Sequence, residues 1–467
     1  MSGDEKQVVV VGGGITGLAC AHRLLRSGVD VLLLEASAGT GGKIETVREG
    51  GYQFEAGPNT LMCGRPELRQ LISELGLEGQ MVPSAPSAKQ RYIAKHGTLM
   101  PLPTRPIELL RSPLLGVRGV MRAAGDLRRS RVSALSPESA AEFVRRRFGA
   151  RALENLAAPF LTGVYAGDVE RLEAASVLRR LVDAERKHGS VIRGMLAEHH
   201  AVRAAGKQPK PQSVTFRDGL DSLPRALAEA LSGRIRTRAP VASMHESRRG
   251  MVIELGTGER IRADHAVLAT PAGTTGSLLL HVEGGEGIAR DLEQVRLASL
   301  AVVGVSFERC DVPHELNGFG YLAGPGASGP VLGCMFRSEM FPHTAPAGMT
   351  LLTAFVGGMR FPTAADEPEE TLVGAVLEQL DALLGVKAAP ERVFVRRWRH
   401  AIPQYEIGHA ARVDRIQRWC ENRRFSVVGS AVTGVSVPDC ITAARSAADR
   451  IVGLLPRMRR GQLCASA

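Results

Sequence analysis

The chain has 467 residues, which is too many for one simple core, so we expect two or three domains. Its 44% hydrophobic and 23% charged residues are ordinary globular usage and argue against disorder. The formal net charge of +11 suits an acidic substrate or an anionic membrane surface, whereas 4% aromatic residues, without interleaved basic residues, argue against nucleic-acid binding.

The seven cysteines are odd in number and form no C-x-x-C pair. This usage argues against a disulfide framework and a zinc site, and it fits a reducing compartment. No signal peptide is recognisable before the first predicted strand, and no run approaches the roughly 18 apolar residues that predict a membrane span. We therefore expect a cytoplasmic protein.

The first 35 residues predict a strand, a glycine turn, a helix, a second strand and an acid. Residues 7–11 include four consecutive valines and predict a buried strand. The glycine turn 12–17 follows, and residues 18–27 then have helical spacing. Residues 29–34 predict the second strand, which ends on Glu35.

Each part of this unit has a physical role in binding a dinucleotide. Gly12 permits the tight turn, Gly14 lets a pyrophosphate approach the backbone, and Gly17 lets the helix pack on the sheet. The helix N-terminus favours the phosphate charge. Glu35 stands where a carboxylate accepts hydrogen bonds from a ribose 2′-hydroxyl.

A second glycine pair, Gly41–Gly42, follows the acid, and its bare backbone can approach another stretch of the same cofactor. Residues 52–60 predict a short strand that enters a Gly-Pro turn. Residues 65–76 predict a helix with Pro66 at its first position. Residues 89–99 predict a hairpin with a His-Gly turn.

Residues 101–210 are helical in pattern and rich in arginine and alanine. Ser136-Pro137-Glu138 predicts a helix start, and Gly149 a helix end. Residues 106–131 combine apolar side chains with many arginines and few acids. This pattern suits either a helix pair that lies on a membrane surface or a core-facing helical domain with a solvated basic face.

The remainder predicts several strands, one amphipathic helix at 372–384 and a return to the opening pattern. The predicted strands are 234–237, 241–244, 251–255, 259–262, 266–269, 301–307, 318–322 and 350–355. Residues 425–430 then predict an apolar strand, 434–440 a small-residue turn, and a long alanine-rich helix begins at Ile441. A second helix N-terminus there could face the other end of one cofactor.

Five further motifs are specific together: Gly57-Pro58-Asn59, residues 163–168 (GVYAGD), 318–322 (GFGYL), 402–405 (IPQY) with Gly408-His409, and 434–440 (GVSVPDC). With residues 12–19, Glu35 and Gly41–Gly42, the chain resembles the flavin amine oxidase superfamily, and within it the oxygen-dependent protoporphyrinogen oxidases. It departs from the superfamily at Lys43, where arginine is usual, and at Pro438, where asparagine or a similar polar residue is common.

The resemblance implies an α/β fold with a discontinuous, Rossmann-like FAD-binding domain, formed by residues 1–85, 213–285 and 420–467. Residues 86–100 and 286–419 would form a mixed-sheet substrate domain. Residues 101–212 would form an inserted, helical, membrane-associating domain, so the protein would attach peripherally to the cytoplasmic membrane. The oligomeric state cannot be read from the sequence, and a homodimer is left open.

The resemblance also implies the site residues. Non-covalent FAD would be held by Gly12, Gly13, Gly14, Ile15, Thr16, Gly17, Glu35, Gly42, Lys43, Gly57, Pro58, Asn59, Thr60, Val241, Ser430, Val435, Ser436 and Val437. The porphyrinogen would lie over the isoalloxazine ring. Arg91 would pair with a propionate, because a guanidinium grips a carboxylate bidentately. The cavity would be lined by Gly163, Tyr165, Gly320, Leu322 and Phe355.

By resemblance, three two-electron oxidations convert protoporphyrinogen IX to protoporphyrin IX in heme biosynthesis, while dioxygen reoxidises the flavin and yields hydrogen peroxide. No metal and no dedicated acid–base residue are required, because the cofactor carries the hard chemistry. We expect His409 to be satisfied by local hydrogen bonds and Tyr165 to pack. Without the resemblance, Arg91 is more simply a surface arginine on a hairpin.

Three alternatives stay open. A close one is oxidation of coproporphyrinogen III, which has four propionates. Another is an amine oxidase or carotenoid desaturase, although two tryptophans and five tyrosines are few for an aromatic cage. The last is a binding protein that kept the fold but lost the flavin and would resemble the Rab GDP-dissociation inhibitors. The intact glycine motifs at both ends of the chain argue against this alternative.

Overall fold

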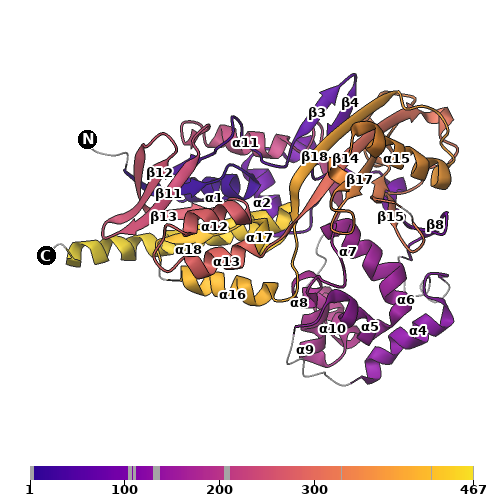
Figure 1. Cartoon of the computed structure of the whole chain (residues 1–467), viewed down its shortest axis with the longest axis horizontal. Coiled ribbons are helices and arrows are strands. Elements are labelled where there is room, and N and C mark those ends of the chain that lie inside the picture. Colours follow the sequence, from indigo (N-terminus) through magenta and orange to yellow (C-terminus); the bar gives the residue numbers. More distant parts are fainter. Residues whose placement is uncertain are drawn as a thin grey trace.

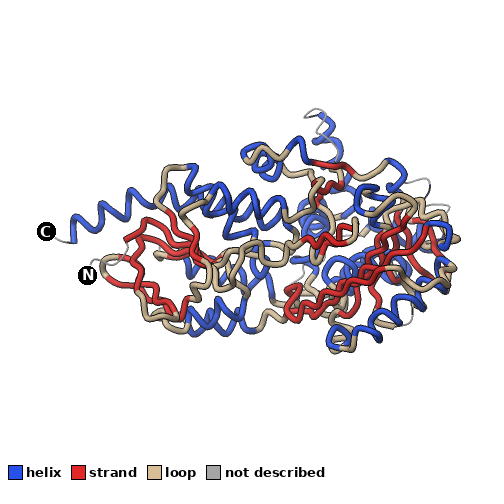
Figure 2. Tube along the Cα trace, turned by 90° about the horizontal axis from the view of Figure 1, so that it is seen from above, coloured by secondary structure: helices blue, strands red, loops and turns tan. Residues whose placement is uncertain are grey.

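A computed structural model of the chain describes residues 5–103, 108, 112–129, 137–204, 211–327, 329–421 and 423–465. Two large sheets lie toward opposite ends of an elongated molecule, and a group of helices lies beside the second sheet (Figure 1). The view from above shows strands at both ends, with helices packed around them (Figure 2).

The first sheet is mixed and gathers strands from three distant parts of the chain. Its order is β10 (Ile235–Arg236), β2 (Val31–Leu34), β1 (Glu5–Val11), β13 (Arg260–Leu268), β12 (Gly250–Leu255) and β11 (Val241–Ser247), and β19 (Phe425–Val427) pairs with β13. The pairs among β10, β2, β1, β13 and β19 are parallel, whereas β11 and β12 add antiparallel pairs. The opening strand–helix–strand prediction is confirmed.

Helices cover both faces of this sheet, which explains why β1 reads as a continuous apolar run. Val8 and Val10 belong to one buried cluster, and Val9 and Val11 belong to another. The helices in the first cluster are α1 (Ile15–Arg26), α2 (Pro66–Glu74), α11 (Ser222–Ala230) and α18 (Val437–Ala465). Those in the second are α12 (Ala272–Leu279), α13 (Glu286–Glu293) and α16 (His409–Cys420).

Three predicted boundaries in this region are wrong. The predicted strands 259–262 and 266–269 are one strand, β13, because β1 pairs with it from Arg262 to Leu268. The predicted strand 425–430 ends at Val427, and Ser430 instead begins the short helix α17 (Ser430–Thr433). Helix α18 begins at Val437 rather than Ile441.

The early start of α18 has a local cause. The hydroxyl of Ser436 accepts a hydrogen bond of 3.2 Å from the backbone N–H of Asp439, as an N-cap residue does. Pro438 then stands in the first turn, where its missing N–H costs no helical hydrogen bond. The departure from the family pattern at Pro438 therefore suits a helix start.

The second sheet is also mixed. Its order is β18 (Arg392–Pro403), β14 (Leu297–Glu308), β17 (Met349–Gly357), β16 (Val331–Met335), β15 (Gly320–Ala323), β7 (Arg91–Lys95) and β8 (Thr98–Pro101). Only the β15–β7 pair is parallel among these described strands. The predicted hairpin 89–99 is confirmed, with positive φ at His96 and Gly97. Helix α15 (Glu369–Leu384) packs on one face of this sheet.

Smaller elements connect the two sheets. A hairpin is formed by β3 (Thr46–Glu49) and β4 (Tyr52–Glu55), and a three-stranded sheet by β5 (Leu61–Met62), β9 (Ser213–Phe216) and β6 (Met81–Pro83). The short helix α14 (Arg337–Met340) follows β16. These elements carry several of the residues discussed below.

The helical region contains α4 (Gly116–Ala124), α5 (Ala140–Phe148), α6 (Ala150–Ala152), α7 (Ala158–Tyr165), α8 (Ala174–Val177), α9 (Arg179–His188) and α10 (Val191–Ala204). Helix α5 does not start at residues 136–138 as predicted. Ser139 is its N-cap and forms a capping box with Glu142, whose carboxylate accepts the Ser139 N–H at 2.8 Å. Gly149 ends the helix as predicted, whereas Ser136 lies outside the described residues.

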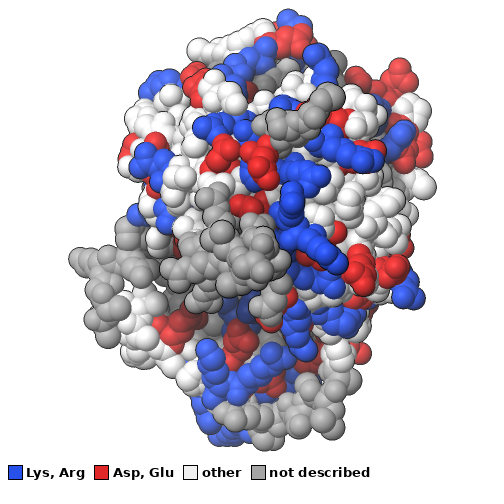
Figure 3. Space-filling view, turned by 90° about the vertical axis from the view of Figure 1, so that its left-hand side faces the viewer, with Lys and Arg blue, Asp and Glu red and all other residues white. Residues whose placement is uncertain are grey.

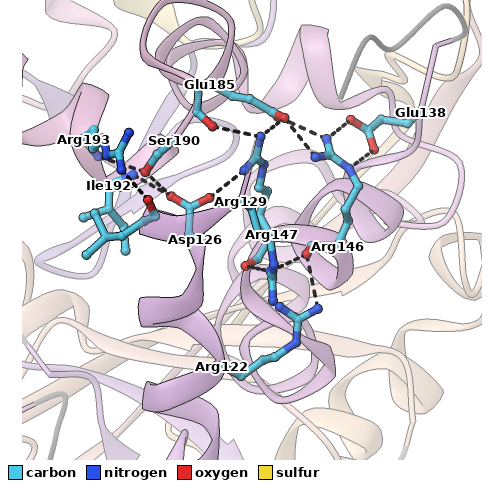
Figure 4. Close-up of polar contacts among 12 residues, drawn as sticks. Arg122, Asp126, Arg129, Glu138, Arg146, Arg147, Glu185, Ser190, Ile192 and Arg193 are labelled. Carbon is cyan, nitrogen blue, oxygen red and sulfur yellow. Dashed lines mark hydrogen bonds and ion pairs between the residues drawn. The ribbon is translucent and has the colours of Figure 1, made fainter. Parts of the chain in front are cut away.

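A buried ionic network holds this region together (Figure 4). Arg147 on α5 has no solvent exposure, and it donates to Asp126 at 3.1 Å and to Glu185 on α9. Asp126 also accepts hydrogen bonds from the Ser190 hydroxyl at 2.6 Å and from the Ile192 N–H at 3.0 Å. Each buried charge of this network has a partner of opposite charge, as burial demands.

Parts of the predicted 106–131 helix pair lie outside the described residues, namely 106–107, 109–111 and 130–131. The described part forms α4 and a 3₁₀ turn at Gly125–Arg128. In the described residues, no helix combines the length and the apolar character needed to cross a bilayer. On the face near the chain termini, Lys and Arg side chains are interspersed with Asp and Glu (Figure 3), so the positive charge there is dispersed.

Candidate active site

The first glycine turn leaves open space at the N-terminus of α1. A Cβ on Gly17 would lie 1.9 Å from the carbonyl oxygen of Gly12, so the turn and the helix can pack only with glycine there. A Cβ on Gly14 would meet nothing within 4 Å. The first turn of α1 contains no acidic residue. Free N–H groups, a positive helix end and open space together suit an anionic group.

Glu35 lies at the end of β2 against this turn, as the sequence predicts. Its carboxylate accepts hydrogen bonds from the Gly13 N–H at 2.6 Å and from the Ser37 N–H and hydroxyl at 2.7 Å. These donors fix the carboxylate beside the turn while leaving it partly exposed. Val241 begins β11 and packs against the cluster that contains Leu32 and Leu34 of β2.

The second glycine pair lies against the first turn. Gly14 and Gly41 form an isolated parallel bridge, and the Gly41 N–H donates to the Gly13 carbonyl at 2.9 Å. A Cβ on Gly42 would lie 3.2 Å from the Cα of Gly14. The fold thus brings both glycine segments to one place, where bare backbone surrounds the open space at Gly14.

The N-termini of α1 and α18 also meet. The Thr16 side chain lies beside the Cys440 thiol, and the two helices share one buried cluster. The Cys440 thiol further contacts the Gly434 carbonyl at 3.5 Å. Residues 434–437, which include Val435, Ser436 and Val437, therefore lie next to the first glycine turn although more than 400 residues separate them in the chain.

The turn at residues 57–60 packs against Lys43. A Cβ on Gly57 would lie 2.0 Å from the Lys43 carbonyl oxygen. The Lys43 ammonium donates to the Ala401 carbonyl of β18 at 2.6 Å, and burial lowers its pKa. Asn59 is buried and donates to the Gly57 carbonyl at 3.1 Å. Its Oδ1 is buried and has no partner among the described residues.

Sequence reasoning missed two charged residues that hold this turn. Arg337 on α14 is fully buried and donates to the Asn59 carbonyl at 2.5 Å and to Glu55 at 3.3 Å. Burial lowers the pKa of Arg337 to about 10 and raises the pKa of Glu55. An acid two residues before Gly57 was visible in the sequence, but its partner 282 residues away was not.

The predicted substrate residues gather on one face of the second sheet. Leu322, Gly333 and Phe355 are register partners across β15, β16 and β17. Arg91 pairs with Gly320 two residues before Leu322, so both share that face. Their strand neighbours Tyr92 and Tyr321 pack instead in the cluster on the α15 side.

Helix α7 packs against this face. A Cβ on Gly163 would lie 2.4 Å from Leu322 Cδ2, so glycine permits the close approach of helix and sheet. The Arg91 side chain is exposed, and its guanidinium lies 4.8 Å from the centroid of the Phe319 ring. Although the residue as a whole is exposed, neighbouring atoms partly desolvate its guanidinium, and this burial lowers the pKa of Arg91. An arginine remains charged, so this side chain offers a cation at the edge of the face.

Tyr165 at the end of α7 connects the face to the α18 N-terminus. Its ring lies 5.8 Å from the Tyr405 ring. Burial raises the pKa of Tyr165 to about 12, and the negative charge of Asp439, in the first turn of α18, contributes to this rise. The ring packs, in agreement with the prediction for this residue.

His409 differs from its prediction. It is buried and stacks on Tyr405 with ring centroids 4.1 Å apart, but its Nδ1 has no partner among the described residues. Burial lowers the pKa of His409 to about 4, so the imidazole is neutral at pH 7. A neutral imidazole can be buried by stacking although one ring nitrogen makes no hydrogen bond. A charged imidazolium without a partner would be too costly to bury.

The sequence pattern described as "Flavin containing amine oxidoreductase" matches residues 15–452. The chain belongs to this family of flavin-containing amine oxidoreductases. The chain is similar to the coproporphyrinogen III oxidase of Bacillus subtilis (strain 168), at 30% identity over 96% of this chain and 98% of that protein. It is also similar to the chloroplastic protoporphyrinogen oxidase of Oryza sativa subsp. japonica, at 32% identity over 96% and 88%.

A crystal structure described as "Putative protoporphyrinogen oxidase from Exiguobacterium sp. 255-15" aligns with a TM-score of 0.78 and 28% identity. The alignment covers 97% of this chain and 99% of that chain. The α/β fold with a Rossmann-like mixed sheet and a second mixed sheet is therefore that of the flavin amine oxidoreductases.

The residues of this chain fit the flavin dinucleotide that the family contains. Open space at Gly14 lies at a helix N-terminus, where a pyrophosphate is stabilised. The buried and unpartnered Oδ1 of Asn59 can accept a hydrogen bond from a ligand. The adjoining N-terminus of α18 offers a second set of backbone donors beside the first.

Proposed function

We propose that this protein is an FAD-dependent porphyrinogen oxidase that converts protoporphyrinogen IX to protoporphyrin IX with dioxygen and releases hydrogen peroxide. Coproporphyrinogen III is the alternative substrate. The observation that carries the proposal is the common face of Arg91, Gly320, Leu322 and Phe355, beside which α7 brings Tyr165 against Tyr405. Full-length similarity to oxidases of both porphyrinogens supports the substrate class.

The chain contributes binding and orientation in this reaction. Residues 12–17, Gly42 and Glu35 would hold the pyrophosphate and ribose, and residues 57–60, Ser430 and 435–437 the flavin portion. Non-covalently bound FAD supplies the two-electron acceptor, which dioxygen reoxidises. The apolar side chains of Leu322 and Phe355 would present a water-poor surface to the macrocycle, and Gly163 would let α7 pack closely beside it.

Arg91 would bind a propionate of the substrate. The guanidinium at the rim of the face is cationic, and arginine binds carboxylates with two parallel hydrogen bonds. The two candidate substrates differ in their propionates: protoporphyrinogen IX has two and coproporphyrinogen III has four. Measuring kcat/KM for protoporphyrinogen IX and coproporphyrinogen III with the FAD-loaded protein tests the choice, because the physiological substrate should have the larger value.

The reaction class has its own test. Porphyrin fluorescence and peroxide should appear together with either porphyrinogen, whereas benzylamine, putrescine and other amines should give no peroxide. Peroxide release with an amine and none with a porphyrinogen would establish an amine oxidase instead. A purified protein that stays colourless after incubation with FAD would favour a binding protein that lacks the flavin.

We further propose that the chain divides into the three domains expected from the sequence and that the helical one docks on the cytoplasmic face of a membrane. The side chains of Val117 and Met121, one turn apart on α4, are 69% and 62% exposed, and Leu127 is also exposed. Arg118 and Arg122 alternate with them on the same helix. Exposed apolar side chains flanked by arginines suit an anionic lipid surface.

A further inference from the structure

Tyr405 lies where the helical region, the second sheet and the α17–α18 connection converge. The residue lies two positions after the end of β18, and it is 4% exposed. Its backbone carbonyl accepts the Glu173 N–H from the helical region at 2.7 Å. Its ring lies 5.8 Å from that of Tyr165 at the end of α7.

The Tyr405 hydroxyl holds the start of one short segment. It donates to the Ser430 carbonyl at the start of α17, and the backbone of Gly434, at the end of the same segment, lies close enough to act on its pKa. Burial raises the pKa of Tyr405, so the hydroxyl stays protonated and able to donate. Gly434 lies three residues before α18 begins at Val437, so this hydroxyl restrains the approach to that helix N-terminus.

Two neighbours hold Tyr405 itself in place. His409 stacks on its ring at 4.1 Å with an interplanar angle of 10°. His409 is the first residue of α16, and the buried carboxylate of Glu173 accepts the N–H groups of Gly408 at 3.1 Å and Ala410 at 2.8 Å. The helix start that carries His409 is therefore anchored to the helical region.

Gln404 fixes the other partner. Its side-chain amide donates to the Tyr165 carbonyl at 2.8 Å and to the Ile402 carbonyl at 3.0 Å, and Gln404 is 2% exposed. A Cβ on Gly167 would lie 2.6 Å from Gln404 Oε1, so glycine admits this amide. Adjacent residues thus hold Tyr165 on one side and the 430–434 segment on the other.

We propose that Tyr405 is a positioning residue that sets the 430–434 segment, and with it the flavin side of the site, relative to Tyr165 on the substrate side. This inference rests on the proposed function, since it takes those two places to contact cofactor and substrate. His409 acts through Tyr405 by stacking, and its unpartnered Nδ1 transfers no proton in the reaction.

Tyr405→Phe tests the proposal, because it keeps the ring and its stack and removes only the hydroxyl. Tyr321→Phe is the matched control: Tyr321 is equally buried, donates to Gln379 at 2.9 Å and lies on the α15 side of the second sheet. We expect Y405F to shift the visible absorption bands and the reduction potential of bound FAD and to lower kcat about tenfold, with KM changed less than twofold. Y321F should leave the spectrum and potential as in the wild type.

His409→Phe and His409→Leu separate stacking from proton transfer. H409F keeps an aromatic partner for Tyr405 and should match the wild-type spectrum and kcat within about twofold. H409L loses the stack and should shift the flavin spectrum in the same direction as Y405F, by less. If Y405F does not fold, as circular dichroism will tell, the H409L spectrum decides, and an unshifted spectrum overturns the proposal.

The outcomes also separate this inference from the proposed function. A wild-type spectrum, potential and kcat in Y405F overturn the positioning role even if the wild-type protein oxidises porphyrinogens. A loss of kcat in H409F with unchanged flavin spectrum would overturn the stacking role in favour of proton transfer. If the wild-type protein binds FAD but oxidises no porphyrinogen, the proposed function fails, whereas the spectral comparison of Y405F with Y321F still decides the role of Tyr405.

Discussion

A Cβ placed on Gly42 would lie 3.2 Å from the Cα of Gly14. The two glycine segments that follow β1 and β2 therefore meet with only backbone between them, and the space in front of Gly14 is open. The binding space exists because these positions carry no side chains. Adding a side chain at Gly14 should therefore block the ligand without disturbing the fold.

Gly14→Leu tests this directly. The backbone of Gly14 has φ −71° and ψ 175°, which any residue adopts, and no atom lies within 4 Å of the added Cβ. We expect G14L to fold with an unfolding temperature like that of the wild-type apoprotein and to bind FAD at least 100-fold more weakly, because the side chain occupies the pyrophosphate space. Equilibrium dialysis with FAD measures the affinity.

Gly287→Leu is the matched control for G14L. Gly287 lies on α13 of the same sheet region, and its Cβ would also meet nothing within 4 Å. Replacing a helical glycine stabilises the folded state by at most about 1 kcal/mol. Because Gly287 is outside the predicted FAD-binding residues, G287L should bind FAD normally. Wild-type FAD affinity in G14L would show that the pyrophosphate lies elsewhere.

Arg91→Ala should weaken substrate binding and leave the FAD content unchanged. A hydrogen-bonded charge pair contributes about 1.5–3 kcal/mol, so KM for the porphyrinogen should rise about 10- to 100-fold. Steady-state kinetics with porphyrin fluorescence measures KM, and Lys95→Ala, at the far end of the same strand β7, is the control. An unaltered KM in R91A removes Arg91 from the site.

Arg147→Met should destabilise the helical region strongly. Removing Arg147 leaves the buried carboxylate of Asp126 without its cation, a change that typically costs about 3–5 kcal/mol. Arg145→Met on the same helix breaks an exposed pair with Glu170 and should cost less than about 1 kcal/mol. Denaturant unfolding followed by circular dichroism compares them, and equal stabilities of R147M and R145M would contradict the buried network.

Val117→Asp combined with Met121→Asp should abolish binding to anionic liposomes. The two acids remove the exposed apolar surface of α4 and repel the lipid charge. Leu280→Asp, at a 49% exposed leucine next to α12, is the control and should still co-float. Flotation at low salt measures the effect, and equal flotation of the double variant and the wild type would remove α4 from the contact.

Much of the first sheet was predictable because its signals are local. The valine run, the glycine turn and Glu35 lie within about 30 residues, and all three occupy the expected places. Strand β18 was not predicted, because its arginines obscure any apolar pattern. It is an edge strand, where charged side chains such as Arg396 and Arg399 find partners in Glu45 and Asp366.

The candidate site was predictable only where a motif marks it. Residues such as Gly163 and Leu322 were named from motifs, and their contact is a result of the fold. Arg337 could not be found, because its role depends on Asn59 and Glu55, which lie 278 and 282 residues away in the chain. The cause is the same for Tyr405, whose partners Tyr165 and Ser430 come from other parts of the chain.

The central claim is that this chain uses bound flavin to aromatise a porphyrinogen at the expense of dioxygen. The most direct measurement is oxygen consumption, peroxide formation and porphyrin fluorescence in one reaction, with G14L as the background for spontaneous oxidation. Each porphyrin requires removal of six electrons, so we predict three dioxygen consumed and three peroxide released per porphyrin by the wild type. Porphyrin formation no faster than in the G14L reaction, with both protoporphyrinogen IX and coproporphyrinogen III, would contradict the claim.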